Sequence, residues 1–119
     1  MHERSLVKGL IEQVIEEGRN RRLGQIHEIR IAIGEFSGVE PVLVKSAFDE
    51  MAGEYWQTPV QLAIEVIPLS AICQTCQSSF RVTDFRFVCP KCGGGEVKIT
   101  AGEEMRLVSL RAEAEKQKE

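Results

Sequence analysis

Four cysteines in two pairs are the feature that most constrains how this chain can fold. They form Cys73-x-x-Cys76 and Cys89-x-x-Cys92, with twelve residues between the pairs. Two short turns at this spacing can face each other and offer four sulfur ligands to one ion. Zn²⁺ suits such a shell because it has no geometric preference of its own and binds sulfur at about 2.3 Å. The sequence therefore predicts a segment closed by one structural metal ion.

Other uses of the cysteines fit the sequence less well. Two disulfides would require an oxidising compartment, but the N-terminus lacks the cationic stretch, apolar core and cleavage site of a secretion signal. No segment approaches the ~20 apolar residues of a membrane span. We therefore expect a cytoplasmic protein with reduced thiols. A redox dithiol is also disfavoured, because neither pair lies in a strand-to-helix context.

The charge balance argues against nucleic acid as a partner. The chain has 15 Lys and Arg against 18 Asp and Glu, a formal net charge of −3, whereas binding to phosphates requires a cationic surface. The cysteine segment is mildly basic, but it shows little interleaving of aromatic and basic residues. A zinc-ribbon module that binds nucleic acid, or a zinc-containing adaptor for protein interactions, is therefore the alternative rather than the preferred interpretation.

Hydrophobic periodicity predicts the elements outside the cysteine segment. Apolar residues recur every three or four positions in two segments and alternate in two others, and a fifth segment is β-like in composition. The predicted elements are a helix over Ser5–Asn20, a half-buried strand over Ile26–Ile33, a helix from Pro41 to about Gly53, a strand over Leu62–Ile67 and a β-like run over Met105–Leu110. A charged tail is expected from Ala112 onward.

The order of these elements predicts an α+β fold. A strand–helix–strand unit implies a parallel pair with a right-handed crossover. The cysteine segment then reads as a zinc-ribbon-like subdomain inserted into a small mixed sheet of about three strands with two helices. The predicted domains are residues 1–69 with 102–112, an α/β domain, and residues 70–101, a zinc-binding domain, followed by the charged tail at 113–119.

The cysteine segment offers few apolar side chains for a core of its own. Because so small a segment cannot bury enough surface to stand alone, the metal must supply much of its folding free energy. Gly93 after the second pair can adopt a left-handed conformation, and the first pair lacks such a glycine, so its turn is expected to be less tightly wound. Residues 93–95 are expected to be mobile and exposed. The sizeable apolar side chains between the two cysteine pairs are Phe80, Val82, Phe85, Phe87 and Val88.

A second group of metal donors begins the chain at Met1-His2-Glu3. Removal of an initiator methionine generally needs a small second residue, so His2 should leave Met1 and its α-amine in place. That amine has an ordinary pKa near 8, and with the His2 amide and imidazole it can close small chelate rings around one ion. The Glu3 amide or carboxylate can complete the plane. Such a nitrogen-rich set suits Ni²⁺ or Cu²⁺, and an exposed terminal site can be loaded and emptied.

Several motifs taken together point to one family. They are Met1-His2-Glu3 followed by Ser5 and Leu6, the stretch 34–40, Phe48, the paired cysteines and residues 104–107. In combination they closely resemble the HypA/HybF family of nickel metallochaperones, which serve hydrogenase maturation. The resemblance runs over essentially the whole chain.

The resemblance implies a nickel carrier that is not an enzyme, with the α/β domain binding nickel. It implies His2 as the essential Ni²⁺ ligand, assisted by the Met1 amine and the Glu3 amide, and Zn²⁺ as the ion of the four cysteines. The implied partners are the GTPase HypB, the precursor of a [NiFe]-hydrogenase large subunit and, in some organisms, urease accessory proteins. The chain is expected to be a monomer or a homodimer that binds neither nucleic acid nor membrane.

A few other residues are weaker candidates for the site. His27 is expected to make local hydrogen bonds, and Glu35 to be a surface residue. Glu40 precedes a helix start, where the positive helix pole favours an acidic residue. The alternative is that this region supplies a sixth, oxygen ligand to the nickel ion. Tyr55 and Trp56 are candidates either for a partner contact or for the core.

Overall fold

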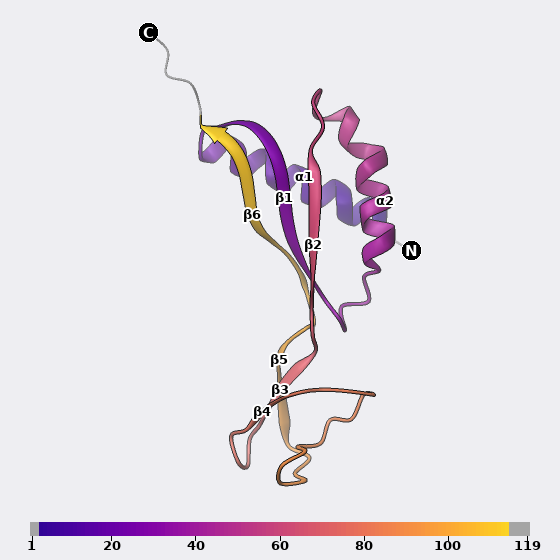
Figure 1. The fold of residues 1–119 in the computed structure, drawn as a ribbon, viewed down its shortest axis with the longest axis vertical. Helices are drawn as coiled ribbons and strands as arrows, with labels where there is room; N and C mark the ends of the chain where they lie inside the picture. The colour runs from indigo at the N-terminus through magenta and orange to yellow at the C-terminus, as the bar shows by residue number, and fades with distance from the viewer. Residues whose placement is uncertain (1–2, 115–119) are drawn as a thin grey trace. The chain divides into compact units, whose positions relative to one another are not determined.

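The computed structural model describes residues 3–114. The strands within these residues form two three-stranded sheets, in the orders β2-β1-β6 and β4-β3-β5 (Figure 1). In chain order the elements are α1 (Glu3–Asn20), β1 (Leu23–Gly34), α2 (Pro41–Met51), the short 3-10 helix η1 (Ala52–Glu54), β2 (Gln61–Ile67), β3 (Ser70–Cys73), β4 (Ser79–Arg81), β5 (Val97–Ala101) and β6 (Met105–Ala114).

The chain divides into two compact units. We call the first the helical unit; it contains the residues up to 31, residues 40–65 and the residues from 106 onward. We call the second the cysteine unit; it contains residues 32–39 and 66–105. Two helices, a mixed sheet and an inserted cysteine segment confirm the predicted α+β class. The domain boundaries given above remain a prediction.

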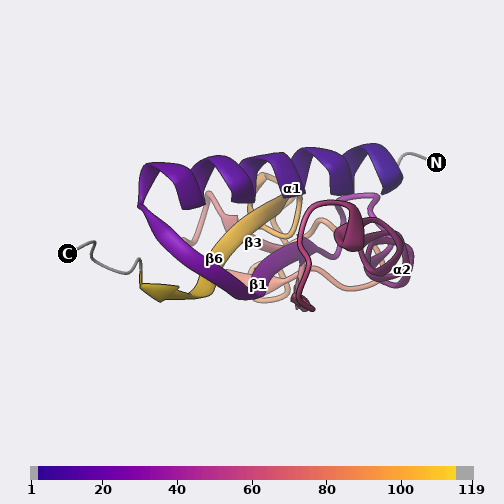
Figure 2. The same ribbon diagram turned by 90° about the horizontal axis from the view of Figure 1, so that it is seen from above.

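α1 packs one apolar stripe into the core of the helical unit. Its buried residues Val7, Leu10, Ile11 and Val14 recur at three- and four-residue intervals, as an amphipathic helix requires. Figure 2 shows α1 lying across the sheet, over β1 and β6. The helix begins at Glu3, two residues before the predicted start, and an acidic residue there suits the positive pole of the helix.

α2 contributes the second half of this core. Pro41 occupies the first turn, where a missing N–H costs nothing because no intrahelical acceptor is available for it. Phe48 is fully buried on the inner face of α2, and the Trp56 ring lies against it with 6.2 Å between ring centroids. Trp56 therefore packs against the core, one of the two roles considered for it. Arg4 Nη1 lies 2.6 Å from Glu50 Oε1 and joins the start of α1 to the end of α2.

β1 is the central strand of its sheet, and its last four residues are buried on both faces. Ile29, Ile31 and Ile33 are buried as predicted, but Ala32 and Gly34 are buried too, so the half-buried strand is wrong at this end. The cause is a close backbone approach. A Cβ added to Gly34 would lie 2.3 Å from the carbonyl of Gly102, and only glycine leaves room for that contact.

The sheet of β2, β1 and β6 is mixed. In Figure 1, β1 and β2 run in the same direction, joined through α2, while β6 runs the opposite way. β6 continues to Ala114, so the prediction of a tail from Ala112 is wrong for its first three residues. His27 Nε2 and Glu113 Oε2 lie 3.1 Å apart there, which ties the end of β6 to β1. Within residues 3–114, no helix is long and apolar enough to span a membrane.

The cysteine unit has a small core on its own antiparallel sheet. Ala71 on β3 pairs with Phe80 on β4 and with Ile99 on β5. Two of the five apolar side chains available between the cysteine pairs stay outside this core, because Phe85 is 69% exposed and Val88 is exposed as well. Apolar residues of β3 and β5 pack there instead. The core consists of the buried residues Leu69, Ala71 and Val82, with Phe80, Phe87, Val97 and Ile99 packed against them.

Candidate metal centre

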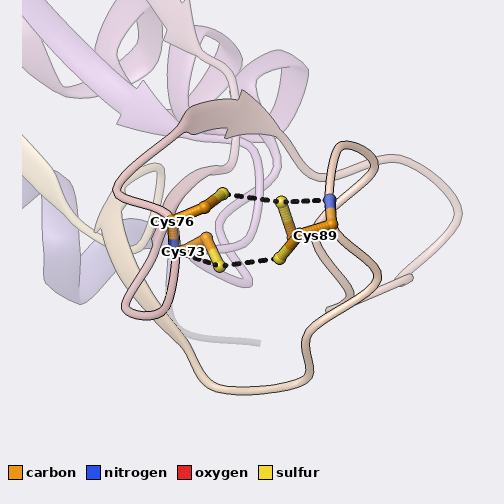
Figure 3. Close-up of side chains that lie close together, drawn as sticks. Cys73, Cys76 and Cys89 are labelled. Carbon is orange, nitrogen blue, oxygen red and sulfur yellow. Dashed lines mark hydrogen bonds between the residues drawn. The ribbon is translucent and has the colours of Figure 1, made fainter.

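The four cysteine sulfurs converge on one point in the cysteine unit. All four lie within 4.8 Å of one another, and the Cys73–Cys92 and Cys76–Cys89 sulfurs are each 3.6 Å apart (Figure 3). A tetrahedral ion with metal–sulfur bonds of about 2.3 Å separates its sulfur ligands by about 3.8 Å. The spacing of the sulfurs therefore fits a tetrahedral metal ion, and an all-sulfur donor set suits Zn²⁺.

The first cysteine turn is closed by backbone hydrogen bonds. The Gln77 N–H donates to the Cys73 carbonyl oxygen at 2.8 Å, and the Cys73 N–H donates to the Ser78 carbonyl oxygen at 2.8 Å. The Cys76 N–H points at Cys73 Sγ, 3.5 Å away. Backbone N–H groups directed at sulfur stabilise a thiolate and fix its orientation towards a metal.

The second turn repeats this pattern bond for bond. The Gly93 N–H donates to the Cys89 carbonyl oxygen at 2.9 Å, and the Cys89 N–H donates to the Gly94 carbonyl oxygen at 2.9 Å. The N–H groups of Lys91 and Cys92 point at Cys89 Sγ, at 3.3 and 3.4 Å. Two turns with the same backbone geometry thus present their sulfurs to each other, as a closed tetrahedral site requires.

The turns differ in the residue that takes the left-handed conformation after each pair. Gly93 has φ +78°, as predicted, and Gln77 occupies the same place in the first turn with φ +66°. The first turn is therefore wound in the same way as the second, and the prediction of a looser turn is wrong. Gln77 Nε2 donates to the Gln74 carbonyl oxygen at 3.1 Å. This bond offsets part of the cost of about 1–2 kcal/mol that a side chain incurs in this conformation.

Gly94 lies against the sulfurs rather than in open solvent. A Cβ added to it would stand 3.3 Å from Cys92 Sγ and 3.6 Å from Thr75 Oγ1. The prediction that residues 93–95 are all exposed is therefore wrong for Gly94, although Gly93 and Gly95 are exposed. The backbone of Gly94 approaches the site closely, since its N–H points at Cys92 Sγ from 3.4 Å.

Hydrogen bonds favour the thiolate form in the first turn. The hydroxyl of Ser78, 3.3 Å from Cys76 Sγ, together with the Ser78 backbone N–H, lowers the pKa of Cys76 to about 6. The backbone N–H of Cys76, ahead of smaller contributions, lowers the pKa of Cys73. Both cysteines are thus prepared to give up their protons to a metal ion.

The pKa of Cys92 is shifted in the opposite direction, because the four sulfurs lie close together. The Gly94 N–H lowers the pKa of Cys92, but the contact with Cys73, desolvation and the other two sulfurs outweigh it and raise that pKa to about 12. Four sulfurs this close cannot all carry negative charge unless a cation lies between them. A divalent ion would remove this conflict and bind all four as thiolates.

Two of the three predicted nickel-binding residues lie outside the residues that the structure describes. Met1 and His2 lie outside the described residues. Glu3 is the first residue of α1 and is buried. The Met1, His2 and Glu3 site therefore stays a prediction.

Three weaker candidates have defined surroundings. His27 was expected to make local hydrogen bonds, but its contact is with Glu113, 86 positions along the chain on β6. Glu40 is the N-cap residue of α2 but makes no side-chain cap hydrogen bond. Glu35 is more than a surface residue, because its carboxylate accepts the Leu69 N–H at 2.8 Å. That bond, and then Arg81, lower the pKa of Glu35. The Leu69 partner lies 34 positions along the chain, so no local sequence signal indicated it.

The site and the fold define a small metal-binding α+β protein whose metal centre lies in an inserted segment. The model of the family described as "Hydrogenase/urease nickel incorporation, metallochaperone, hypA" matches residues 1–112. The chain belongs to this HypA family, as the motifs predicted.

Similar proteins match nearly the full length of this chain. Hydrogenase maturation factor HypA from Shewanella baltica (strain OS223) is 36% identical over 115 residues, which cover 97% of this chain and 98% of that protein. Hydrogenase maturation factor HypA 2 from Bradyrhizobium diazoefficiens is 34% identical over 110 residues, 92% of this chain and 97% of that protein. The solution structure of the Ni metallochaperone HypA from Helicobacter pylori matches with a TM-score of 0.70 at 33% identity, covering 97% and 100% of the two chains.

Proposed function

We propose that this protein binds Ni²⁺ at its N-terminus and delivers it for the maturation of a [NiFe]-hydrogenase and, where the organism makes one, of urease. The observation that carries the proposal is the family match over residues 1–112, in a family described by nickel incorporation. The protein carries its metal as cargo and catalyses no reaction. Its partners are the GTPase HypB and the precursor of the hydrogenase large subunit, with urease accessory proteins as further recipients.

The nickel ligands in this proposal are the Met1 amine, the His2 amide and imidazole, and the Glu3 amide. The start of α1 at Glu3 supports the use of an amide there. The first N–H groups of a helix have no intrahelical acceptor, so a metal can replace the Glu3 proton without breaking a helical hydrogen bond. The positive pole of the helix also lowers the cost of deprotonating that amide.

The zinc in this proposal is structural and is held by Cys73, Cys76, Cys89 and Cys92. Support comes from the sulfur separations of 3.6 Å and from the two matched turns. Four protein ligands leave a tetrahedral ion no open position for a substrate. Zinc therefore holds the segment together, while nickel is exchanged elsewhere in the molecule.

A metal titration of the untagged, zinc-loaded protein tests this proposal. We expect about one Ni²⁺ per chain in addition to tightly bound zinc, and loss of the nickel, but not the zinc, in His2→Ala. The matched control is His27→Ala, which removes the only other histidine and should leave both metals in place. Nickel binding that survives both His2→Ala and an N-terminal extension would overturn the assignment. A protein that takes up zinc but no nickel would instead be an interaction adaptor.

A further inference from the structure

A tight turn in the loop between β4 and β5 (Figure 1) holds two residues in the left-handed conformation. The Arg86 N–H donates to the Thr83 carbonyl oxygen at 3.0 Å, and the two central residues, Asp84 and Phe85, have φ +54° and +56°. Turns of this type usually contain Asn-Gly or Asp-Gly, because the left-handed conformation costs free energy in a residue that has a Cβ. Phenylalanine in the place of that glycine is therefore strained.

Burial of the Phe85 ring does not offset this strain. Phe85 is 69% exposed, and its ring lies against that of Phe36, itself 45% exposed, with 5.6 Å between ring centroids. The Phe87 ring, which packs on the small core, lies 6.3 Å from the same Phe36 ring. Large apolar side chains that are exposed, and backbone positions that are strained, are both concentrated at binding surfaces.

A cleft opens beside the two exposed rings. It has a volume of about 310 Å³ and lies within the cysteine unit. Its apolar lining consists of Phe36 and Phe85 together with Leu69 and Val82, which belong to the buried core of this unit. We call this feature the aromatic cleft. It offers aromatic rings and aliphatic side chains to a ligand that has an apolar part.

The charged lining of the aromatic cleft is acidic on balance. It consists of Glu35, Arg81 and Asp84. Arg81 Nη2 lies 3.4 Å from Glu35 Oε2, so these two charges offset each other. Asp84 has no ion-pair partner among residues 3–114. The neighbouring cation of the turn, Arg86, lines a different cleft, so the turn places its acidic residue alone beside the exposed rings.

Two more acidic residues lie next to Phe36 along the backbone. The Phe36 N–H donates to the Gly102 carbonyl oxygen at 2.7 Å, and the next two residues are Glu103 and Glu104. Both are exposed, and neither forms an ion pair with another residue that the structure describes. The exposed rings are thus bordered by carboxylates whose charge no nearby side chain neutralises, which is the surface that a cationic partner would complement.

We propose that the aromatic cleft binds a basic segment of a partner protein, with an arginine or lysine side chain lying over the Phe36 and Phe85 rings. A cation in that position is attracted by the faces of the rings and by the carboxylate of Asp84. The alkyl part of the same side chain packs against Leu69 and Val82, as long basic side chains do on apolar surfaces. The strained turn keeps the Phe85 ring at the edge of the cleft for this contact.

The first experiment titrates the zinc-loaded full chain with a five-residue peptide of alternating leucine and arginine, blocked at both ends. Backbone amide signals in NMR spectra report the contact. We expect saturable shifts at residues 35–36 and 82–86, and an affinity that falls as the salt concentration rises, because exposed charges are screened. The control peptide has glutamate in place of each arginine and should not bind. Equal binding of the two peptides, or no saturable shift up to about 5 mM peptide, overturns the proposal.

The second experiment repeats the titration with variants of the cleft. Phe85→Ala should weaken binding of the arginine peptide by about tenfold or more, as for an aromatic residue at the centre of a contact, and Asp84→Asn by about threefold. The control variants are Val88→Ala, an exposed apolar residue that lines a different cleft, and Glu96→Gln, an exposed acidic residue of the same unit. Both should bind like the wild type. Equal losses in the control and cleft variants would mean that this site is wrong.

Phe85→Gly separates a binding role of the ring from a structural one. Glycine suits the left-handed position, so this variant should retain zinc against a chelator at least as well as the wild type and yet lose the peptide. Weaker retention of zinc would show that the ring stabilises the unit, which contradicts the proposal. If Phe85→Ala changes the sedimentation of the chain without peptide, a second copy occupies the cleft and the proposal is again wrong. None of these measurements uses nickel, so their result is independent of the proposed function.

Discussion

The two units of this protein are each stabilised by a different kind of interior. The helical unit buries a broad set of large side chains, among them Ile11, Ile29 and Phe48, and burial of such side chains is the main source of folding free energy. The cysteine unit has only Leu69, Ala71 and Val82 in the buried part of its apolar cluster. It also has four sulfurs gathered within 4.8 Å. A metal ion bound by these sulfurs would add to the folding free energy of a unit whose own apolar core is small.

Removal of the metal should produce the largest effect. It should unfold the cysteine unit and leave the helical unit folded. Chelation, or Cys89→Ser, should unfold the cysteine unit, because ion binding supplies much of its folding free energy. Backbone amide signals of β3, β4 and β5 in NMR spectra report this loss. The single tryptophan, Trp56, packs on Phe48 in the helical unit, so its fluorescence should stay native. If the cysteine unit keeps its native amide signals without metal, then the metal is not needed for its folding and this prediction is wrong.

Truncation of the helical core should produce the next largest effect. Phe48→Ala removes a fully buried ring and should lower the free energy of unfolding by roughly 3–5 kcal/mol. Urea denaturation followed by circular dichroism measures it. The control is Phe85→Ala in the cysteine unit, which should change stability by no more than about 0.5 kcal/mol because the ring is largely exposed. Similar losses in the two variants would mean that Phe85 is part of a core.

A smaller effect should distinguish the two cysteine turns. Gln77→Gly removes a side chain from a left-handed residue and should stabilise the zinc-loaded cysteine unit by roughly 0.5–1 kcal/mol. Gly93→Gln should destabilise it by roughly 1–2 kcal/mol, although a Cβ at Gly93 would meet no atom within 4 Å. Competition for zinc by a chelator measures both changes. Equal and neutral results would show that backbone conformation does not limit either turn.

The smallest effect concerns the carboxylate of Glu35 in the cysteine unit. The Leu69 N–H and Arg81 lower its pKa below the ordinary value of 4.5. A carboxylate with a lowered pKa stabilises the folded state above its unfolded pKa, and this contribution disappears as the pH falls through its folded pKa. Glu35→Gln should therefore narrow the stability difference between neutral and acidic pH, with Glu103→Gln as the control. An unchanged pH profile in Glu35→Gln would show that the contact contributes no linkage.

Sequence patterns predicted the features that depend on neighbouring residues. The buried stripe of α1, the start of α2 at Pro41 and the facing cysteine pairs all follow from local spacing. Features that depend on distant residues were missed. The contact of Glu35 with Leu69, the burial of Ala32 and the extension of β6 to Ala114 each depend on a segment far along the chain, which local periodicity cannot indicate. Gln77 was missed because a left-handed conformation there is imposed by the turn and opposes the preference of the residue.

The close approach of Gly102 to Leu69 brings the two ends of the cysteine segment together. A Cβ added to Gly102 would lie 2.5 Å from Leu69 Cα, so the chain enters and leaves this segment at adjacent points. A segment with adjacent ends can be shortened, lengthened or exchanged as a cassette while the strands that lead into it keep their spacing. Gly102, with φ +103°, is the junction residue that such an exchange would have to retain.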